Sequence, residues 1–433
     1  MFSKRKRRQS ARRNLLLVAL LVLFFGALAV GVRLVKLEPV LILPEGREEI
    51  AARRQSPDNA ALVLSEAYRL LPKNAPKGPL LIDDPNRPGQ KRIYEAEIDS
   101  ISRFLGFERP DDHPEVLDYL RACEPATAKA REALQKPFFL LTEPPGLIRY
   151  WGGRSIGAAI TLEKLLVAQG NAAWKFENDL PKGIGCITDA LRLVNLTAQD
   201  TPSRGGWPDD CLSTAYRILR EMAAEKPTAE RLALLQTSLT AVGPPYPNRK
   251  ALLEASWRMI DDTQLNPVPE RESRFPESVV TRFFLWRLRG LAASIRDSKD
   301  LWYEQVNATP SAYHKWKMQR PEFQKRRNQM FWYGPLQEVD RIVQYASSTQ
   351  KEYYGTLLAI ALERYRAAQG AYPETLTALS PDYLPDLPQD PLTGEAIGYR
   401  RQKEGYLLYS VGMNLRDDEG HPDDQLLFGN GSR

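Results

Sequence analysis

The feature that most restricts how this chain can fold is an uncharged apolar segment near its amino end. Residues 15–32 contain no charged side chain, and as a helix they span about 27 Å, close to the hydrocarbon thickness of a bilayer. Seven basic residues and no acidic residue precede them, an asymmetry that keeps the amino end in the cytoplasm. We therefore expect a basic cytoplasmic segment, residues 1–14, and a single-pass anchor in the inner (cytoplasmic) membrane, residues 15–37. The bulk of the chain is then extracytoplasmic, in the periplasm.

A cleaved signal peptide is the alternative interpretation of the same segment. Its apolar core would be residues 15–26, and the Ala-Leu-Ala at positions 27–29 would be the small-residue cleavage site. The apolar run continues past that site to Val32, which favours an uncleaved anchor. Both interpretations export the rest of the chain.

The basic excess of the chain belongs to this amino-terminal segment. The whole chain has 60 Lys and Arg against 54 Asp and Glu, and nine of the basic residues lie within residues 1–37. The remainder has 51 basic and 54 acidic residues, so the pI near 9.0 does not indicate a nucleic-acid partner. The sequence has neither a Gly-x-x-x-x-Gly-Lys-Ser/Thr motif nor a strand-flanked Gly-x-Gly-x-x-Gly motif. We therefore expect no nucleotide ligand.

Residues 38–345 have the apolar spacing of helices separated by proline-rich breaks. A helix is expected over residues 155–169, with Gly170 as its stop. No fixed helical repeat of about 34 or 40 residues is present. The expected fold class is mainly α, an irregular helical array or bundle. The clearest apolar stripe recurs every three or four residues and comprises Leu212, Ala215, Tyr216, Leu219, Met222 and Ala223.

The cysteines and histidines are too scattered to indicate a metal site. Cys123, Cys186 and Cys211 form no Cys-x-x-Cys pair, which excludes zinc-ribbon and thioredoxin-type chemistry. The three histidines, at positions 113, 314 and 421, have no ligand spacing either. Three buried, small apolar thiols are expected. The alternative is one disulfide with one thiol left over.

One short motif matches a catalytic pattern. Gly153, Ser155 and Gly157 have the Gly-x-Ser-x-Gly spacing with which serine hydrolases expose their nucleophile on a strand-to-helix turn. The residues before it are too poor in apolar side chains for a buried strand, which favours a helix start with a serine in its first turn. An extracytoplasmic hydrolase, acting through Ser155 or through carboxylates beside the aromatic segment 283–333, is the alternative to a non-enzymatic function.

The carboxyl-terminal residues 346–433 carry the most specific pattern in the chain. An apolar helix face ends in Gly-x-Tyr-Pro at positions 370–373, and Leu-Pro-Gln-Asp-Pro follows at positions 387–391. Two strand-like stretches, residues 397–400 and 405–410, are joined by a polar turn. This pattern predicts a β-hairpin.

This order of motifs resembles the globular domain of the type II secretion major pseudopilins. The resemblance implies a small α+β module whose hairpin ends in Tyr-Ser-x-Gly, here positions 409–412, before an acidic loop. The whole layout also resembles anchored bacterial envelope proteins of unknown function. The family's Gly-Phe-type cleavage motif and the glutamate inside its apolar helix are missing. The resemblance therefore implies the fold of the module rather than assembly into a fibre.

The same resemblance implies calcium in the acidic loop, because the major pseudopilins bind it there. Calcium takes roughly six to eight oxygen ligands on a flexible loop. Here Asp417 and Asp424 would be the main ligands. The alternative is a solvated loop whose Asp and Asn content reflects Asx turns. The loop residues that offer oxygens are Asn414, Asp417, Asp418, Asp423 and Asp424, with Ser410 before them.

These features together predict a membrane-anchored envelope protein with a non-enzymatic, binding or structural function. The helical region would bind a protein or the cell wall, and the pseudopilin-like module would be a small structural or docking part linked to secretion. A direct component of the secretion apparatus is a third interpretation.

Overall fold

The computed structural model describes most of the chain after the amino-terminal segment. The described residues are 46–72, 80–83, 91–94, 114–142, 154–200, 210–225, 228–246, 249–261, 334–403, 405–412, 414–419 and 425–429, with isolated positions and short stretches between 20 and 43 and between 286 and 315.

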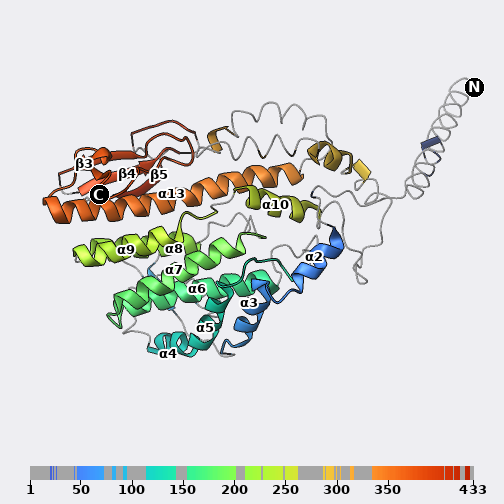
Figure 1. Cartoon of the computed structure of the whole chain (residues 1–433), viewed down its shortest axis with the longest axis horizontal. Coiled ribbons are helices and arrows are strands. Elements are labelled where there is room, and N and C mark those ends of the chain that lie inside the picture. The colour runs from blue at the N-terminus through green and yellow to red at the C-terminus, as the bar shows by residue number, and fades with distance from the viewer. Residues whose placement is uncertain are drawn as a thin grey trace, which may run out of the picture.

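Most of the described chain is helical, as the sequence predicted, and the helices stack in layers (Figure 1). The three amino-proximal helices α3, α4 and α5 form one outer layer against α6 and α7. The helices α8 and α9 follow, and α13 covers them. The helices are α2 (Arg47–Arg54), α3 (Ala60–Arg69), α4 (Pro114–Ala122), α5 (Glu124–Ala133), α6 (Arg154–Lys175), α7 (Leu180–Thr197), α8 (Asp210–Ala224), α9 (Ala229–Val242), α10 (Arg249–Ile260) and α13 (Gly334–Gln369).

One apolar core runs through these layers, and the predicted stripe of α8 lies at its centre. Every member of that stripe is buried, because α8 packs between α6 and α13. Burial of such side chains stabilises the fold by about 1.5–3 kcal/mol each for the larger ones. The three cysteines are buried free thiols, which is the first of the two interpretations offered by the sequence.

Gly170 does not end a helix, contrary to the sequence-based expectation. It lies inside α6, which continues to Lys175. A Cβ at Gly170 would stand 2.8 Å from the carbonyl oxygen of Gly183 in α7 and 2.6 Å from Cγ1 of Ile187. The glycine is there because α6 and α7 approach each other too closely for a side chain, which is a packing reason that apolar spacing alone does not reveal.

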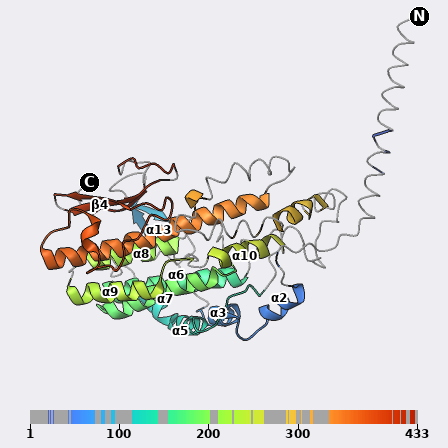
Figure 2. The same ribbon diagram turned by 45° about the horizontal axis from the view of Figure 1, so that its top comes forward.

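The carboxyl-terminal module consists of the second half of α13, a short 3-10 helix, η4 (Leu376–Leu379), and a three-stranded antiparallel sheet. The strands β3 (Gly398–Gln402) and β4 (Gly405–Ser410) form the predicted hairpin. A third strand, β5 (Gln425–Gly429), pairs with β4 and was not expected. The sheet lies along α13, on the side opposite α8 and α9 (Figures 1 and 2).

A single helix therefore serves both parts of the chain. α13 crosses residues 345–346, where the sequence suggests a boundary. Ile360 faces the core of the helical layers, while Leu358 and Leu362 belong to the core of the carboxyl-terminal module. The Arg220 guanidinium of α8 donates to Glu352 at 3.0 Å and to Thr356 at 2.9 Å on α13.

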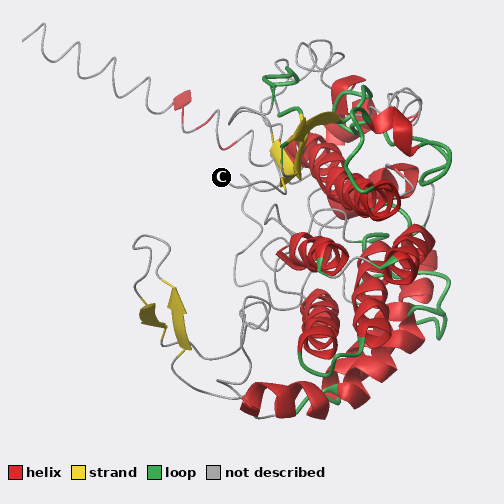
Figure 3. Ribbon diagram, turned by 90° about the vertical axis from the view of Figure 1, so that its left-hand side faces the viewer, coloured by secondary structure: helices red, strands yellow, loops and turns green. Residues whose placement is uncertain are grey.

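A separate two-stranded hairpin precedes α4. It pairs β1 (Leu80–Asp83) with β2 (Lys91–Tyr94) and stands apart from the helices (Figure 3). Among the residues that the structure describes, no helix combines the length and the apolar character needed to cross a membrane. The expected anchor, residues 15–37, lies almost wholly outside the described residues.

We expect Gly183→Ala to destabilise the protein by about 1–3 kcal/mol. The new Cβ would lie 2.9 Å from the Gly170 carbonyl oxygen and 3.2 Å from the Trp174 Cβ, so the helices must separate. Gly185→Ala is the matched control in the same helix. Nothing lies within 4 Å of its Cβ position, and it should stabilise by about 0.5–1 kcal/mol through helix propensity. Denaturant unfolding of the full chain checks both. Equal effects of the two substitutions would contradict the close approach of α6 and α7.

Candidate functional site

Ser155 is the second residue of α6, so the Gly-x-Ser-x-Gly motif falls at a helix start. This agrees with the helix-start interpretation of the motif. The Ser155 side chain, residues 143–153, His113 and His421 lie outside the described residues. The hydrolase alternative therefore stays a prediction.

The described part of the acidic loop uses its side chains in local turns. Asn414 donates to Asp418 at 2.8 Å and accepts from the Arg416 amide at 3.1 Å. Asp417 accepts from the Glu419 amide at 2.8 Å. Within the described residues, no three His, Cys, Asp or Glu side chains converge as metal ligands.

The remaining expected calcium ligands are not brought together in the described part of the chain. Asp423 and Asp424 lie outside it. Ser410 is buried, and its hydroxyl donates to Asp390 at 2.6 Å. The calcium site stays a prediction.

Asp390, from the Leu-Pro-Gln-Asp-Pro motif, is a buried junction of the carboxyl-terminal module. Besides Ser410 it accepts from the amides of Leu392 at 2.8 Å and Val411 at 3.2 Å. Burial raises the pKa of Asp390, and the Ser410 hydrogen bond opposes that shift. Two sequence motifs that are 20 residues apart are thus joined by one carboxylate.

Lys351 of α13 is buried in the same region. Its side chain is 1% exposed, and its ammonium has no hydrogen-bond partner among the described residues. Burial lowers its pKa from 10.5 to about 8, and the nearby carboxylates of Glu352 and Asp390 oppose the shift.

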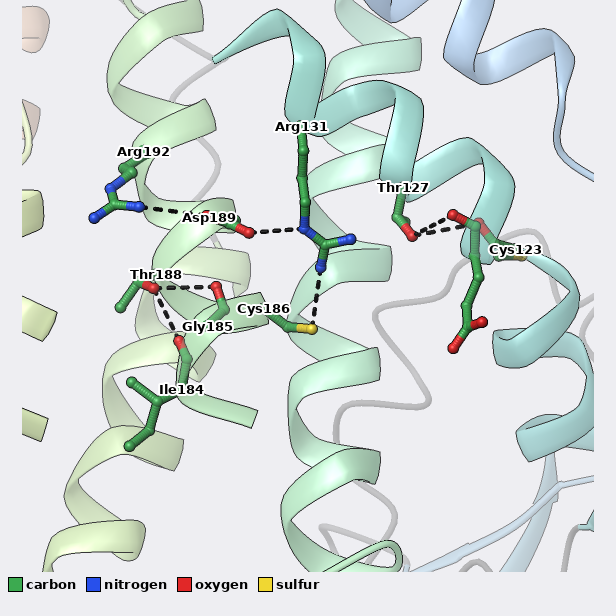
Figure 4. A network of polar contacts seen from close by, with 10 residues as sticks. Cys123, Thr127, Arg131, Ile184, Gly185, Cys186, Thr188, Asp189 and Arg192 are labelled. Atoms are coloured by element: carbon green, nitrogen blue, oxygen red, sulfur yellow. Dashed lines mark hydrogen bonds and ion pairs between the residues drawn. The ribbon is translucent and has the colours of Figure 1, made fainter. Parts of the chain in front are cut away.

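A small cavity of about 210 Å³ lies among α4, α5, α6 and α7. Figure 4 shows Arg131 reaching from α5 to two residues of α7. Its Nε donates to Asp189 at 2.7 Å, and its Nη2 donates to the Cys186 sulfur at 3.2 Å. Lys182 is likewise paired, with Glu177 at 2.8 Å. Burial raises the pKa of Cys186, and the nearby Arg131 opposes the shift. The Arg131 and Lys182 charges in this wall are therefore satisfied internally.

A larger opening, the α8–α9 cleft, lies where α6 and α8 end and where α7 and α9 begin. Its volume is about 820 Å³, within the range of ligand sites. The α6–α7 connection turns back there through Asn178, which has a φ of 54°. Residues lining it are Trp174, Lys175, Phe176, Asn178, Leu180, Glu221, Ala224, Glu225 and Arg231.

Arg231 occupies this cleft because the helix start of α9 fixes its backbone. The Thr228 hydroxyl caps α9 by accepting from the Arg231 amide at 3.3 Å. The Arg231 side chain is 15% exposed, and its Nη2 is 3.6 Å from the Glu225 carboxylate. Its Nε and Nη2 are buried and have no hydrogen-bond partner among the described residues. Burial lowers the pKa of Arg231, and Glu225 opposes the shift.

The other charged side chains of the cleft form pairs of opposite sign. Lys175 lies 3.8 Å from Glu221 and 5.4 Å from the centre of the Trp174 ring. Glu221 also pairs with Arg217. The walls thus offer cations, carboxylates and an aromatic surface to a bound molecule.

Sequence reasoning did not identify this cleft. Its residues come from three chain segments, 174–180, 221–225 and 231, and no local motif links them. Pro227 precedes Thr228 in the sequence, so a helix start could be predicted there, but not which helix ends meet at the cleft.

A scan against protein-family models finds no match, and neither do searches of curated proteins and of solved structures. The resemblance of the carboxyl-terminal module to pseudopilins therefore stays a prediction.

We expect Lys351→Met to raise the free energy of unfolding by about 3 kcal/mol at pH 7. Below pH 8 the Lys351 ammonium is charged in both the folded and the unfolded state, so the full free-energy cost of burying the charge lowers the stability of the wild type. Between about 8 and 10.5 the unfolded state binds more protons, so wild-type stability rises and the difference shrinks. Urea unfolding at pH 7 and pH 10 measures the difference in the free energy of unfolding between Lys351→Met and the wild type. Lys250→Met, at an exposed lysine, is the control. A difference that is equal at both pH values would contradict this assignment.

If the acidic loop binds calcium, millimolar calcium should raise the melting temperature of the full chain above its value in excess chelator. Asp417→Asn should remove most of that increase, because it removes a carboxylate ligand. Asp386→Asn, an exposed change in the same module but outside the loop, should keep it. Identical melting temperatures in calcium and chelator would contradict the site.

Proposed function

We propose that this chain is a single-pass, membrane-anchored envelope protein whose extracytoplasmic helical region binds a partner without catalysis. The carboxyl-terminal module is a structural or docking part linked to secretion. The observation that carries the binding function is the α8–α9 cleft, an opening of about 820 Å³ lined by aromatic and charged side chains. Sites that recognise ligands combine these properties.

The position of the cleft supports a link between binding and docking. Its walls include the ends of α8 and α9, and both helices pack on α13. Gln236 of α9 donates to the Tyr383 carbonyl of the carboxyl-terminal module at 2.6 Å, and Arg364 of α13 donates to Gln236 at 2.7 Å. A partner held in the cleft would therefore be connected to the module through α9.

The test is cross-linking in living cells with tagged full-length protein, followed by membrane extraction and mass spectrometry. Ala224→Trp should fill the cleft and reduce capture of its partner by about tenfold, because Ala224 lines it. Ala233→Trp on the exposed face of α9 is the matched control and should capture normally. Recovery of secretion-apparatus proteins would support the docking part. If both variants capture as the wild type does, the cleft is not the binding site.

A further inference from the structure

Arg231 is the least satisfied cation among the described residues of the α8–α9 cleft. Two of its nitrogens are buried without an acceptor, and Glu225 stands just outside hydrogen-bond distance. Burying these two N–H groups without a hydrogen-bond acceptor is costly, so the guanidinium gains from an incoming anion. Carboxylates fit its planar fork through paired N–H donors.

The rest of the charge pattern restricts which anion can enter. Glu221 and Glu225 also line the cleft, so Lys175 and Arg231 are balanced by two carboxylates. A polyanion would meet these carboxylates, and a polycation would meet the two cations. A molecule that carries one carboxylate and one ammonium group finds a counter-charge for each.

The uncharged part of the wall indicates what lies between those two charges. Trp174, Phe176 and Leu180 supply aromatic and aliphatic surface, which suits a side chain of modest size. The volume of about 820 Å³ has room for several residues of an extended peptide.

We propose that the α8–α9 cleft binds a short zwitterionic peptide, with the free carboxylate paired to Arg231 and the amino group facing Glu225. This inference rests on the proposed binding function and specifies the chemistry of the same site. Burial of Arg231 next to an open cleft, together with balanced charges around it, is the observation behind it. Binding requires the guanidinium to turn its Nε–Nη2 edge toward the cleft or to bond through its remaining nitrogen.

The experiment is calorimetric titration of the full chain in detergent with the tripeptide Ala-Leu-Ala. The same peptide as its carboxyl-terminal amide should bind about tenfold more weakly, since it loses one charge-assisted contact. Arg231→Gln should weaken the free acid about tenfold and bind acid and amide equally. Arg192→Gln, an exposed arginine on α7, is the control and should preserve the preference.

A second variant separates recognition from folding. Glu225→Gln changes an exposed carboxylate and should abolish the preference for the free over the N-acetylated peptide, while keeping the preference for acid over amide. No binding to the wild type at millimolar peptide, equal affinity for acid and amide, or an unchanged preference in Arg231→Gln would each overturn the proposal.

The two proposals fail differently. If Ala224→Trp abolishes partner capture in cells while the tripeptide shows no preference for its free acid, the cleft binds something other than a zwitterionic peptide. If the tripeptide binds Ala224→Trp as it binds the wild type, the peptide site lies elsewhere and this inference is wrong. If cell capture is also unaffected, the proposed binding function fails with it.

Discussion

The close approach of α6 and α7 at Gly170 and Gly183 places the central helices relative to one another. With no side chain at either position, the two backbones pack directly against each other. A Cβ at Gly183 would also lie 3.2 Å from the Trp174 Cβ of α6 and 3.3 Å from the Met222 methyl group of α8. The same point therefore sets where the last turn of α6 stands relative to α8. That placement opens the α8–α9 cleft, since Trp174 forms part of its wall.

Buried polar residues also fix how the packed elements are positioned relative to one another. Arg220 joins α8 to α13, and Asp390 joins two motifs of the carboxyl-terminal module. Lys351 stands among them with its ammonium unpaired within the described chain. Buried charged groups of this kind add little stability, but they penalise packings in which their partners are absent. Arg220 therefore restricts how α8 packs on α13, and the Lys351 charge near Asp390 restricts how the carboxyl-terminal module packs on the same helix.

The sequence allowed much of the architecture to be predicted, for identifiable reasons. The α8 stripe was found because amphipathic spacing is local, and the β3–β4 hairpin because alternation and a polar turn are local too. Gly170 was misread because a glycine that stops a helix and one that admits a neighbouring helix look alike in sequence. Arg231 was missed because its significance arises only when three distant helix ends meet. The anchor, calcium and pseudopilin predictions stay untested.

The diameter of one helix separates the sheet from the α8 and α9 layer. Glu352, Thr356 and Arg364 of α13 bond to α8 and α9, and Leu358 and Leu362 of the same stretch belong to the core of the carboxyl-terminal module. A helix with its side chains is about 10–12 Å across, so the two layers share one support rather than a linker. A substitution that kinks α13 within this stretch would therefore change the orientation of the sheet relative to α8 and α9.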